Sequence, residues 1–197
     1  NPELGLRLAT ALHWFWHCRR GNEEGLHWLE QVLVAEAEER GSSPLTPERT
    51  RCRARALRWA AWSAGLTGEP AKEHKFSAES RELYQSLGTD GKIGYAYAVI
   101  LYEVIRASSP AKAFRLIDEC QAIFEEAGDW FGIANCYHRR GHIARFHKDY
   151  EKAKAYYEQE MALHKEHGDL DSAAGDLMFL SFTNYNQGKT EQARALC

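Results

Sequence analysis

The sequence predicts an all-α protein, a solenoid of antiparallel helix pairs, and three observations predict this fold class. Residues recur at a period of 40 along the chain. Each repeat carries two successive segments with apolar or small residues at helical spacing, separated by a short polar turn. No stretch alternates β-branched with polar residues over the length of a strand. Because one helix pair cannot bury its apolar faces alone, successive pairs are expected to stack.

The period is visible in residues that return without a gap. The pair Gly128-Asp129 returns as Gly168-Asp169 after 40 residues, and Gly88 lies 40 residues before Gly128. In each Gly-Asp pair the glycine is placed to end one helix and the aspartate to cap the next. The same shift relates Ala113 to Ala153 and Ala193, Ala122 to Ala162, Ile123 to Leu163, and Phe76 to Leu116 and Tyr156.

Applied to the whole chain, the period gives one repeat domain over residues 1–197. Its five units run over about 1–40, 47–88, 90–128, 130–168 and 170–197, the last truncated. The stretch "GSSPLTPERT", residues 41–50, is predicted to be an inter-repeat loop because Ser, Pro and Gly gather there. Since the sequence stops inside a helical pattern, we expect it to be a fragment of a larger protein.

The composition is typical of a soluble globular protein, with 44% hydrophobic and 27% charged residues. A net charge of −3 and a pI near 6.3 give no overall attraction to nucleic acid or to an anionic membrane. No apolar run is long enough to span a bilayer. The cysteines, Cys18, Cys52, Cys120, Cys136 and Cys197, form no CxxC pair, so we expect reduced thiols and a cytoplasmic location.

The segments "YEKAKAYYEQEMALHKEHGD" and "GHIARFHKDYEKA" resemble tetratricopeptide repeats (TPRs). Gly141, Tyr150, Ala153 and Tyr157 stand at the small and aromatic signature positions of that family. The resemblance covers nearly the whole chain and implies a right-handed superhelix in which the first helix of each pair lines the concave face.

The repeat length and the segments "SAESRELYQSLG" and "CQAIFEEAGD" resemble the longer repeats of bacterial signal-transduction ATPases of the STAND class. "ATALHWFWHCRRGNEEGLHWLEQVL" is similar to the aromatic-rich helix pair that opens those arrays. This resemblance implies a sensor array of a bacterial multidomain regulator, whose nucleotide-binding switch would lie outside this sequence.

The stretch "HWFWHC", residues 13–18, raises the possibility of a zinc site. His13 and His17 lie four residues apart, on one face of a helix, and Cys18 follows directly. The aromatic residues between them are typical of a packing helix, and the TPR register puts His13 at a close-packed position. We therefore interpret this stretch as packing.

Two further histidine pairs, His138 with His142 and His164 with His167, lie on different helices of one unit. Spacing alone brings no four ligands together, so the sequence predicts no metal site and no cofactor. "GKT", residues 188–190, is not a phosphate-binding loop, because Thr183 stands where that loop needs glycine. No catalytic constellation is found, and a non-enzymatic protein is predicted.

The 40-residue shift aligns aromatic and basic residues on the inferred concave face. One row contains Trp62, Tyr102, His142 and Phe182, and a second contains Arg58, Ala98, His138 and Met178. The candidate binding residues are Arg55, Arg58, Trp62, Tyr95, Tyr102, His138, Arg139, His142, Arg145, Met178, Phe182 and Tyr185. Aromatic rings and arginines suit an extended peptide with carboxylate or phosphate groups, and packing between repeats is the alternative interpretation.

The predicted function is a non-catalytic sensor that binds a protein or peptide, or an anionic small ligand, and signals to a neighbouring domain of the parent chain. A self-association or intramolecular docking scaffold is the second hypothesis, with Trp14, Trp16 and Trp28 at the docking end. Nucleic acid ranks last, because the basic run "RTRCRARALR" has no continuation, and no membrane partner is expected.

Overall fold

The fold was analysed in a computed structural model of the chain. The structure describes residues 2–19 and 21–196, without the side chains of Trp14 and Cys18. The chain divides into two compact units, residues 1–102 and residues 103–197. Each unit is described below by itself.

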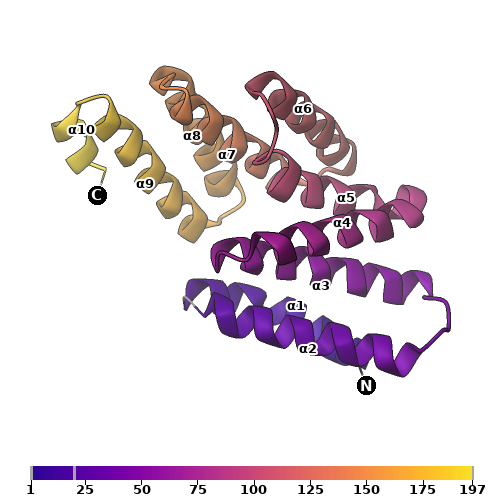
Figure 1. The fold of residues 1–197 in the computed structure, drawn as a ribbon. Helices are drawn as coiled ribbons and strands as arrows, with labels where there is room; N and C mark the ends of the chain where they lie inside the picture. Colours follow the sequence, from indigo (N-terminus) through magenta and orange to yellow (C-terminus); the bar gives the residue numbers. More distant parts are fainter. Residues whose placement is uncertain (1, 20, 197) are drawn as a thin grey trace. The chain divides into compact units, whose positions relative to one another are not determined.

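Unit 1 consists of helices joined by short turns, each packed against the next (Figure 1). The helices are α1 (Pro2–Cys18), α2 (Asn22–Arg40), α3 (Pro47–Leu66), α4 (Pro70–Ser86) and α5 (Lys92–Ala98). A 3₁₀ turn, Gly88–Gly91, precedes α5, and a π-helical turn, Val99–Glu103, follows it. The boundary between the units therefore falls inside this π-helical turn.

Unit 2 continues the same pattern of helix pairs (Figure 1). Its helices are α6 (Pro110–Ala127), α7 (Trp130–Phe146), α8 (Tyr150–Glu166), α9 (Leu170–Asn186) and α10 (Thr190–Arg194). The described part of the chain, residues 2–19 and 21–196, contains no strand. Within those ranges no helix combines the length and the apolar character needed to cross a membrane. The all-α fold predicted from the sequence is confirmed.

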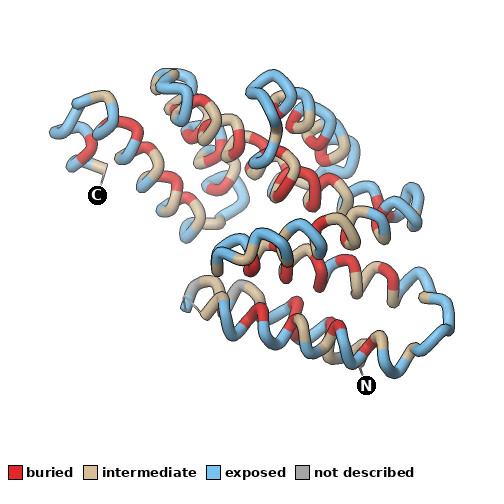
Figure 2. The backbone as a smooth tube through the Cα atoms, in the orientation of Figure 1, coloured by how far each residue is buried: buried red, intermediate tan, exposed pale blue. Residues whose placement is uncertain are grey.

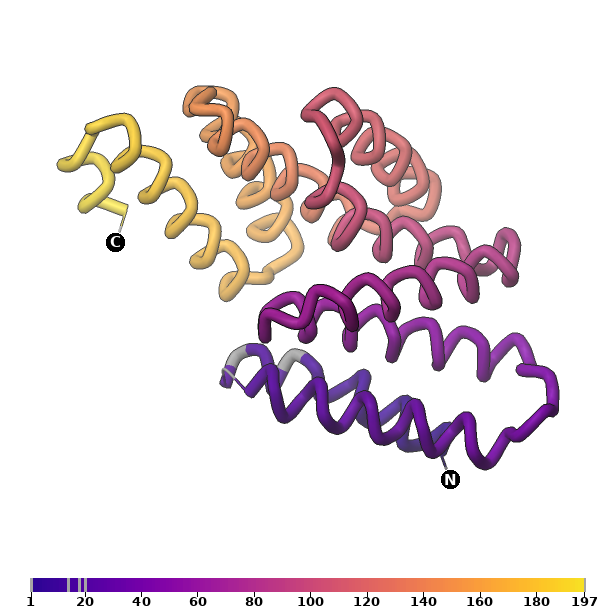
Figure 3. The backbone as a smooth tube through the Cα atoms, in the orientation of Figure 1, coloured from indigo at the N-terminus to yellow at the C-terminus, as the bar shows by residue number. Residues whose placement is uncertain are grey.

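The loop predicted over residues 41–50 is shorter in the structure, and that expectation was wrong for its second half. Helix α3 begins at Pro47, so only residues 41–46 connect α2 to α3 (Figure 3). The Thr46 side chain accepts a hydrogen bond from the backbone N–H of Arg49, and Pro47 occupies the first helical turn, where it is tolerated. The capping threonine and the proline thus start the helix inside the polar stretch.

The Gly-Asp pairs of the repeat separate the helix pairs as predicted. Gly128 ends α6 with a φ of 65°, and Gly168, which follows α8, has a φ of 74°, both in the left-handed region that favours glycine. Asp129 then accepts a hydrogen bond from the N–H of Gly132 at 3.0 Å, and Asp169 from that of Ser172 at 3.1 Å. One dipeptide therefore ends one helix and caps the next.

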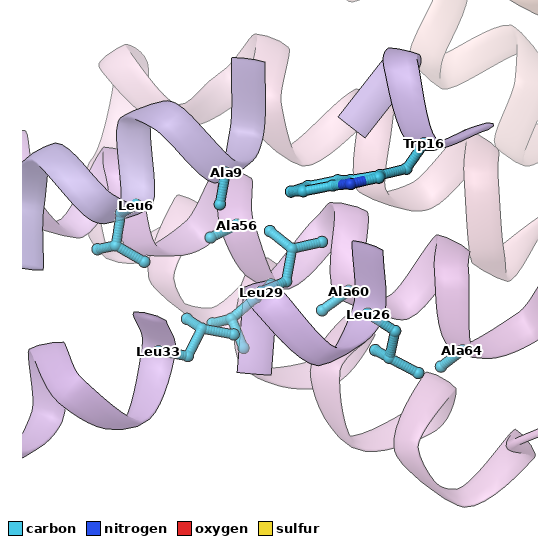
Figure 4. Close-up of a cluster of buried hydrophobic side chains, with 10 residues drawn as sticks. Leu6, Ala9, Trp16, Leu26, Leu29, Leu33, Ala56, Ala60 and Ala64 are labelled. Atoms are coloured by element: carbon cyan, nitrogen blue, oxygen red, sulfur yellow. The ribbon is translucent and has the colours of Figure 1, made fainter. Parts of the chain in front are cut away.

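The core of unit 1 lies between α1, α2 and α3 (Figure 4). Its buried members are Leu6, Ala9, Trp16, Leu26, Leu29, Leu33, Ala56, Leu57, Ala60 and Ala64. Small residues of α3 face large residues of α1 and α2, so the three helices can approach closely. Figure 2 shows the buried turns of α1 to α3 on their facing sides.

A buried ion-pair network ties α2, α3 and α4 together beside this core. The side chain of Glu36 is completely buried, and its carboxylate lies 2.7 Å from the guanidinium of Arg53. Arg53 also pairs with Glu79 at 2.7 Å, and Arg40 lies 3.3 Å from Glu36. Burial disfavours the charge of Arg53, but its hydrogen bonds to the two carboxylates offset this and raise its pKa.

Removing Arg53 should destabilise unit 1 strongly. Arg53→Ala leaves the buried Glu36 carboxylate with Arg40 alone, and the free energy of unfolding should fall by about 2–4 kcal/mol. The matched control is Arg51→Ala, since Arg51 pairs with Glu48 at the surface and should cost less than about 1 kcal/mol. Urea denaturation of both variants measures the difference, and equal losses would contradict a buried role for Arg53.

In unit 2 the close approach of two helices depends on Gly141. Tyr157 of α8 is completely buried, and a Cβ added at Gly141 of α7 would lie 2.6 Å from its ring. A Cβ at Gly132 would likewise meet the buried ring of Phe124 at 2.3 Å. The two aromatic rings therefore occupy the space that a larger side chain at Gly132 or Gly141 would need.

Gly141→Ala should lower the free energy of unfolding by about 1–2 kcal/mol, because the strain of overpacking exceeds the gain in helix propensity. Gly175→Ala is the matched control. An added Cβ at Gly175 meets no atom within 4 Å, so this substitution in α9 should stabilise by up to about 1 kcal/mol. Thermal unfolding followed by circular dichroism measures both changes, and a stabilised Gly141→Ala protein would exclude the close packing.

Candidate functional site

In unit 1, the predicted binding residue Arg58 of α3 contacts two aromatic rings. Its guanidinium lies 4.7 Å from the ring centre of Trp59 and 4.9 Å from that of Tyr97, a cation–π contact with each ring. Tyr102 is only 6% exposed, and its hydroxyl is hydrogen-bonded to Nδ1 of His74 at 2.8 Å. Arg58 and Tyr102 therefore contribute to packing within unit 1, the alternative interpretation of the aligned rows.

The other predicted residues of unit 1 differ in exposure. Trp62 is half-buried and its ring meets that of His17 edge to face, with centroids 6.2 Å apart. Tyr95 is half-buried, whereas Arg55 is exposed. Arg55 is thus the predicted cation of this unit that is most open to a partner.

In unit 2, the predicted residues of α7 are covered by the next helix pair. The rings of His138 and His142 meet Phe179 of α9 edge to face, with centroids 4.9 and 5.1 Å apart. Arg139 is buried, and Arg145 is half-buried. Because Tyr102 and Arg139 are both buried, neither side chain is available for direct contact with a ligand at the surface.

The corresponding positions of α9 form an exposed stripe, here called the α9 stripe: Met178, Phe182 and Tyr185. These side chains are 48%, 52% and 63% exposed. Their spacing puts all three on one face of the helix, and Figure 2 shows buried and exposed turns alternating along α9. By the 40-residue shift they correspond to His138, His142 and Arg145 of α7. Phe179 of the following helix pair covers the first two of these positions on α7, whereas on α9, in the last helix pair of the given sequence, all three are exposed.

The structure contains a cavity of about 260 Å³ beside α8, α9 and α10. Its lining residues are Lys154, Glu158, Leu180, Asn184, Gln192, Ala195 and Leu196. None of the predicted binding residues lines it, so the cavity is separate from the α9 stripe.

A buried polar cluster, which the histidine spacing did not reveal, lies between α7, α8 and α9. Nδ1 of His164 is 2.7 Å from Oδ2 of Asp176, and Nδ1 of His138 is 2.9 Å from Oε1 of Glu160. Glu160, His164 and Asp176 are 5%, 4% and 2% exposed. Ligand atoms of these three residues all lie within 4.8 Å of one another.

Burial controls the protonation of this cluster. It lowers the pKa of His138 to about 3, and it raises the pKa of Glu160, where the charge of Asp176 acts in the same direction. His138 and Glu160 are therefore joined by a neutral hydrogen bond at pH 7. Burial also disfavours the charge of His164, but its hydrogen bond to Asp176 and the charge of that carboxylate raise its pKa. Burial lowers the pKa of Arg139 to about 10, which leaves the guanidinium charged at pH 7.

Glu160 and Asp176 were missed because each looks like an ordinary surface acid in the sequence. One signal was available, since Glu160 and His164 lie four residues apart and therefore on one face of α8. Asp176 is contributed by the next helix, and no spacing rule connects it to α8. His142 and His167, the other members of the histidine pairs, lie outside the three-residue group.

The stretch at residues 13–18 contributes to packing. The ring of His13 stacks on Trp59 with centroids 3.4 Å apart and planes inclined by 17°, and its Nδ1 is hydrogen-bonded to the carbonyl of Thr10. The Cys18 and Trp14 side chains lie outside the described residues. Of the other two tryptophans in the proposed docking end, Trp16 is buried and Trp28 is 49% exposed.

The "GKT" segment, residues 188–190, is a turn between helices. Gly188 has a φ of 79°, α10 begins at Thr190, and Lys189 is paired with Glu151 at 3.2 Å. The segment therefore connects two helices, whereas a phosphate-binding loop follows a strand.

These features define an all-α solenoid of TPR-like helix pairs. The chain is similar to the crystal structure of nearly identical TPR-like repeats from a protein of Podosopora anserina assigned as a kinesin light chain. The TM-score is 0.54 at 13% sequence identity, and the match covers 100% of this chain and 92% of that chain. At this identity the likeness concerns the fold alone. No protein-family model matches the chain, and no curated protein sequence matches it.

His13 should make the stability of unit 1 depend on pH. Burial lowers its pKa from 6.5 to about 4, so between these values the unfolded chain binds a proton that the folded chain does not. The contribution of His13 is thus fully present above pH 6.5 and is lost as the pH falls towards 4. Because the ring is partly exposed, we expect a loss of only about 1–2 kcal/mol.

The measurement compares urea denaturation of the native protein and of His13→Gln at pH 7 and pH 4.5. The variant should lose less stability than the native protein over this range, whereas a variant of the exposed His27, His27→Gln, should follow the native protein. Parallel curves for His13→Gln and the native protein would contradict the prediction.

Proposed function

We propose that the chain is a non-catalytic protein-binding module and that the α9 stripe is its main contact surface in unit 2. The observation that carries this proposal is the row of three large apolar side chains, Met178, Phe182 and Tyr185, each about half exposed. An exposed apolar row on one helix face is typical of an interaction surface. Tyr185 and Phe182 supply rigid contact area at a low cost in conformational entropy.

Packing between the repeats suggests which kind of partner would fit the α9 stripe. His138 and His142, the counterparts of Met178 and Phe182 on α7, pack against an aromatic side chain of α9, Phe179. A partner that packs on α9 in the way that α9 packs on α7 would place an aromatic side chain of a helix against the α9 stripe. We therefore propose a helical segment of another protein as the occupant.

In a longer parent protein we propose that binding is passed to a neighbouring domain, as the resemblance to STAND sensor arrays implies. In unit 1, the exposed Arg55 and the half-buried Tyr95 would bind a peptide or an anionic ligand. The second hypothesis is a self-association or intramolecular docking scaffold with its docking end at Trp14, Trp16 and Trp28. In that case a second copy of the chain would be the occupant of the α9 stripe. The identity of the captured protein separates the two.

Site-specific photo-crosslinking in cells of the source organism tests the stripe. A photoreactive phenylalanine analogue at position 182 should give a discrete crosslinked product, because that side chain would lie inside the interface. The matched control is the same analogue at Phe146, which is 82% exposed at the end of α7 but outside the stripe. Met178→Glu should reduce the product at position 182 by at least about tenfold, since it places a charge in an apolar contact.

Mass spectrometry then identifies the crosslinked species. A different protein with its crosslink in a helical segment supports the proposal, and a second copy of this chain supports the scaffold hypothesis. The same products at positions 182 and 146, or products that persist in the folded Met178→Glu protein, would contradict a role of the α9 stripe in either.

A further inference from the structure

We propose that Glu160, His164 and Asp176 form a binding site for one divalent transition-metal ion, with Zn²⁺ as the best fit. The group combines two carboxylates and one imidazole, contributed by α8 and α9. All three residues are more than nine-tenths buried, so the group is unlike the exposed acidic clusters that are common on protein surfaces. The site is independent of the α9 stripe and of any partner.

The distances suit a metal ion after small movements of the side chains. Zn²⁺ binds nitrogen and oxygen ligands at about 2.0–2.2 Å, which places neighbouring ligand atoms of a tetrahedral site about 3.3–3.6 Å apart. Nδ1 of His164 and Oδ2 of Asp176 now lie 2.7 Å apart, and no pair of ligand atoms in the group exceeds 4.8 Å. Adjustments of about 1 Å or less at each side chain would therefore complete the site.

The donor set selects the class of metal. Calcium and magnesium prefer oxygen ligands in larger numbers, whereas a site of one imidazole and two carboxylates suits zinc and its neighbours in the first transition row. Binding would release the proton that Glu160 carries at pH 7 and the proton between Nδ1 of His164 and Asp176. The two carboxylates would then neutralise the double charge of the ion, which matters in a buried position. Three protein ligands leave one position for a water molecule.

The surroundings support the ligands. His138 of α7 is hydrogen-bonded to Glu160, and such contacts fix the orientation of a ligating carboxylate. The Trp130 and Phe131 rings border His164, with centroids 6.2 and 6.4 Å from the imidazole, and limit the access of water. Arg139, which also interacts electrostatically with Glu160, competes with a metal for this carboxylate, so we expect an affinity below that of cysteine-based zinc sites.

A metal at this position would join two successive helix pairs. Glu160 and His164 belong to α8, which closes the fourth pair, and Asp176 belongs to α9, which opens the fifth. The ion would therefore act as a crosslink between repeats and stiffen unit 2. Binding to the folded chain alone raises its stability by mass action.

Isothermal titration calorimetry with zinc chloride tests the site, using the metal-free 197-residue chain without a histidine tag. We expect one Zn²⁺ per chain and a rise in the melting temperature of about 5–10 °C at a hundredfold excess over the dissociation constant. Asp176→Asn and His164→Gln should abolish both effects. His167→Gln is the matched control, because His167 is an exposed histidine near the end of α8, outside the group, and should leave both unchanged.

X-ray absorption of the zinc-loaded native protein identifies the ligands directly, so the test does not depend on the folding of the variants. A shell of nitrogen and oxygen without sulfur supports the proposal. Sulfur ligands, no stoichiometric binding, or binding retained in folded Asp176→Asn and His164→Gln proteins would overturn it.

Discussion

The close approach of successive helices, made possible where a glycine faces a buried aromatic ring, is the constraint on which the rest of the structure depends. Tyr157 fills the space over Gly141, and Phe124 fills the space over Gly132. In unit 1 the ring of Tyr84 lies over Gly94 in the same way. Each contact joins one helix to the next, so the chain is held together by a series of local contacts, as expected of a repeat protein.

Both units bury polar and charged residues between stacked helices. In unit 1, Arg40 and Arg53 balance the charges of Glu36 and Glu79 inside one set of three helices. The Glu160–His164–Asp176 group in unit 2 holds two acids and two histidines, counting His138, in a similar position. Buried acids need compensating protons, cations or metals. Arginines compensate the buried acids of unit 1, whereas histidines are hydrogen-bonded to the buried acids of unit 2.

The repeat also explains why equivalent positions differ in role. His138 and Met178 share one repeat position, as do His142 and Phe182. The α7 members are covered by Phe179, whereas the α9 members are half exposed. A repeat position is therefore covered or exposed according to what lies against it. The α9 stripe takes its proposed function from this difference.

The sequence by itself determined the all-α fold, the helix pairs and their turns, because these depend on local signals such as the Gly128-Asp129 pair and the spacing of apolar residues. The repeat period also placed Met178, Phe182 and Tyr185 of the α9 stripe among the candidate binding residues. Only the tertiary structure decided that Tyr102 and Arg139 are buried and that Asp176 joins Glu160 and His164. Burial and contacts between helices depend on how side chains from separate helices meet in space, and no spacing within one helix specifies that.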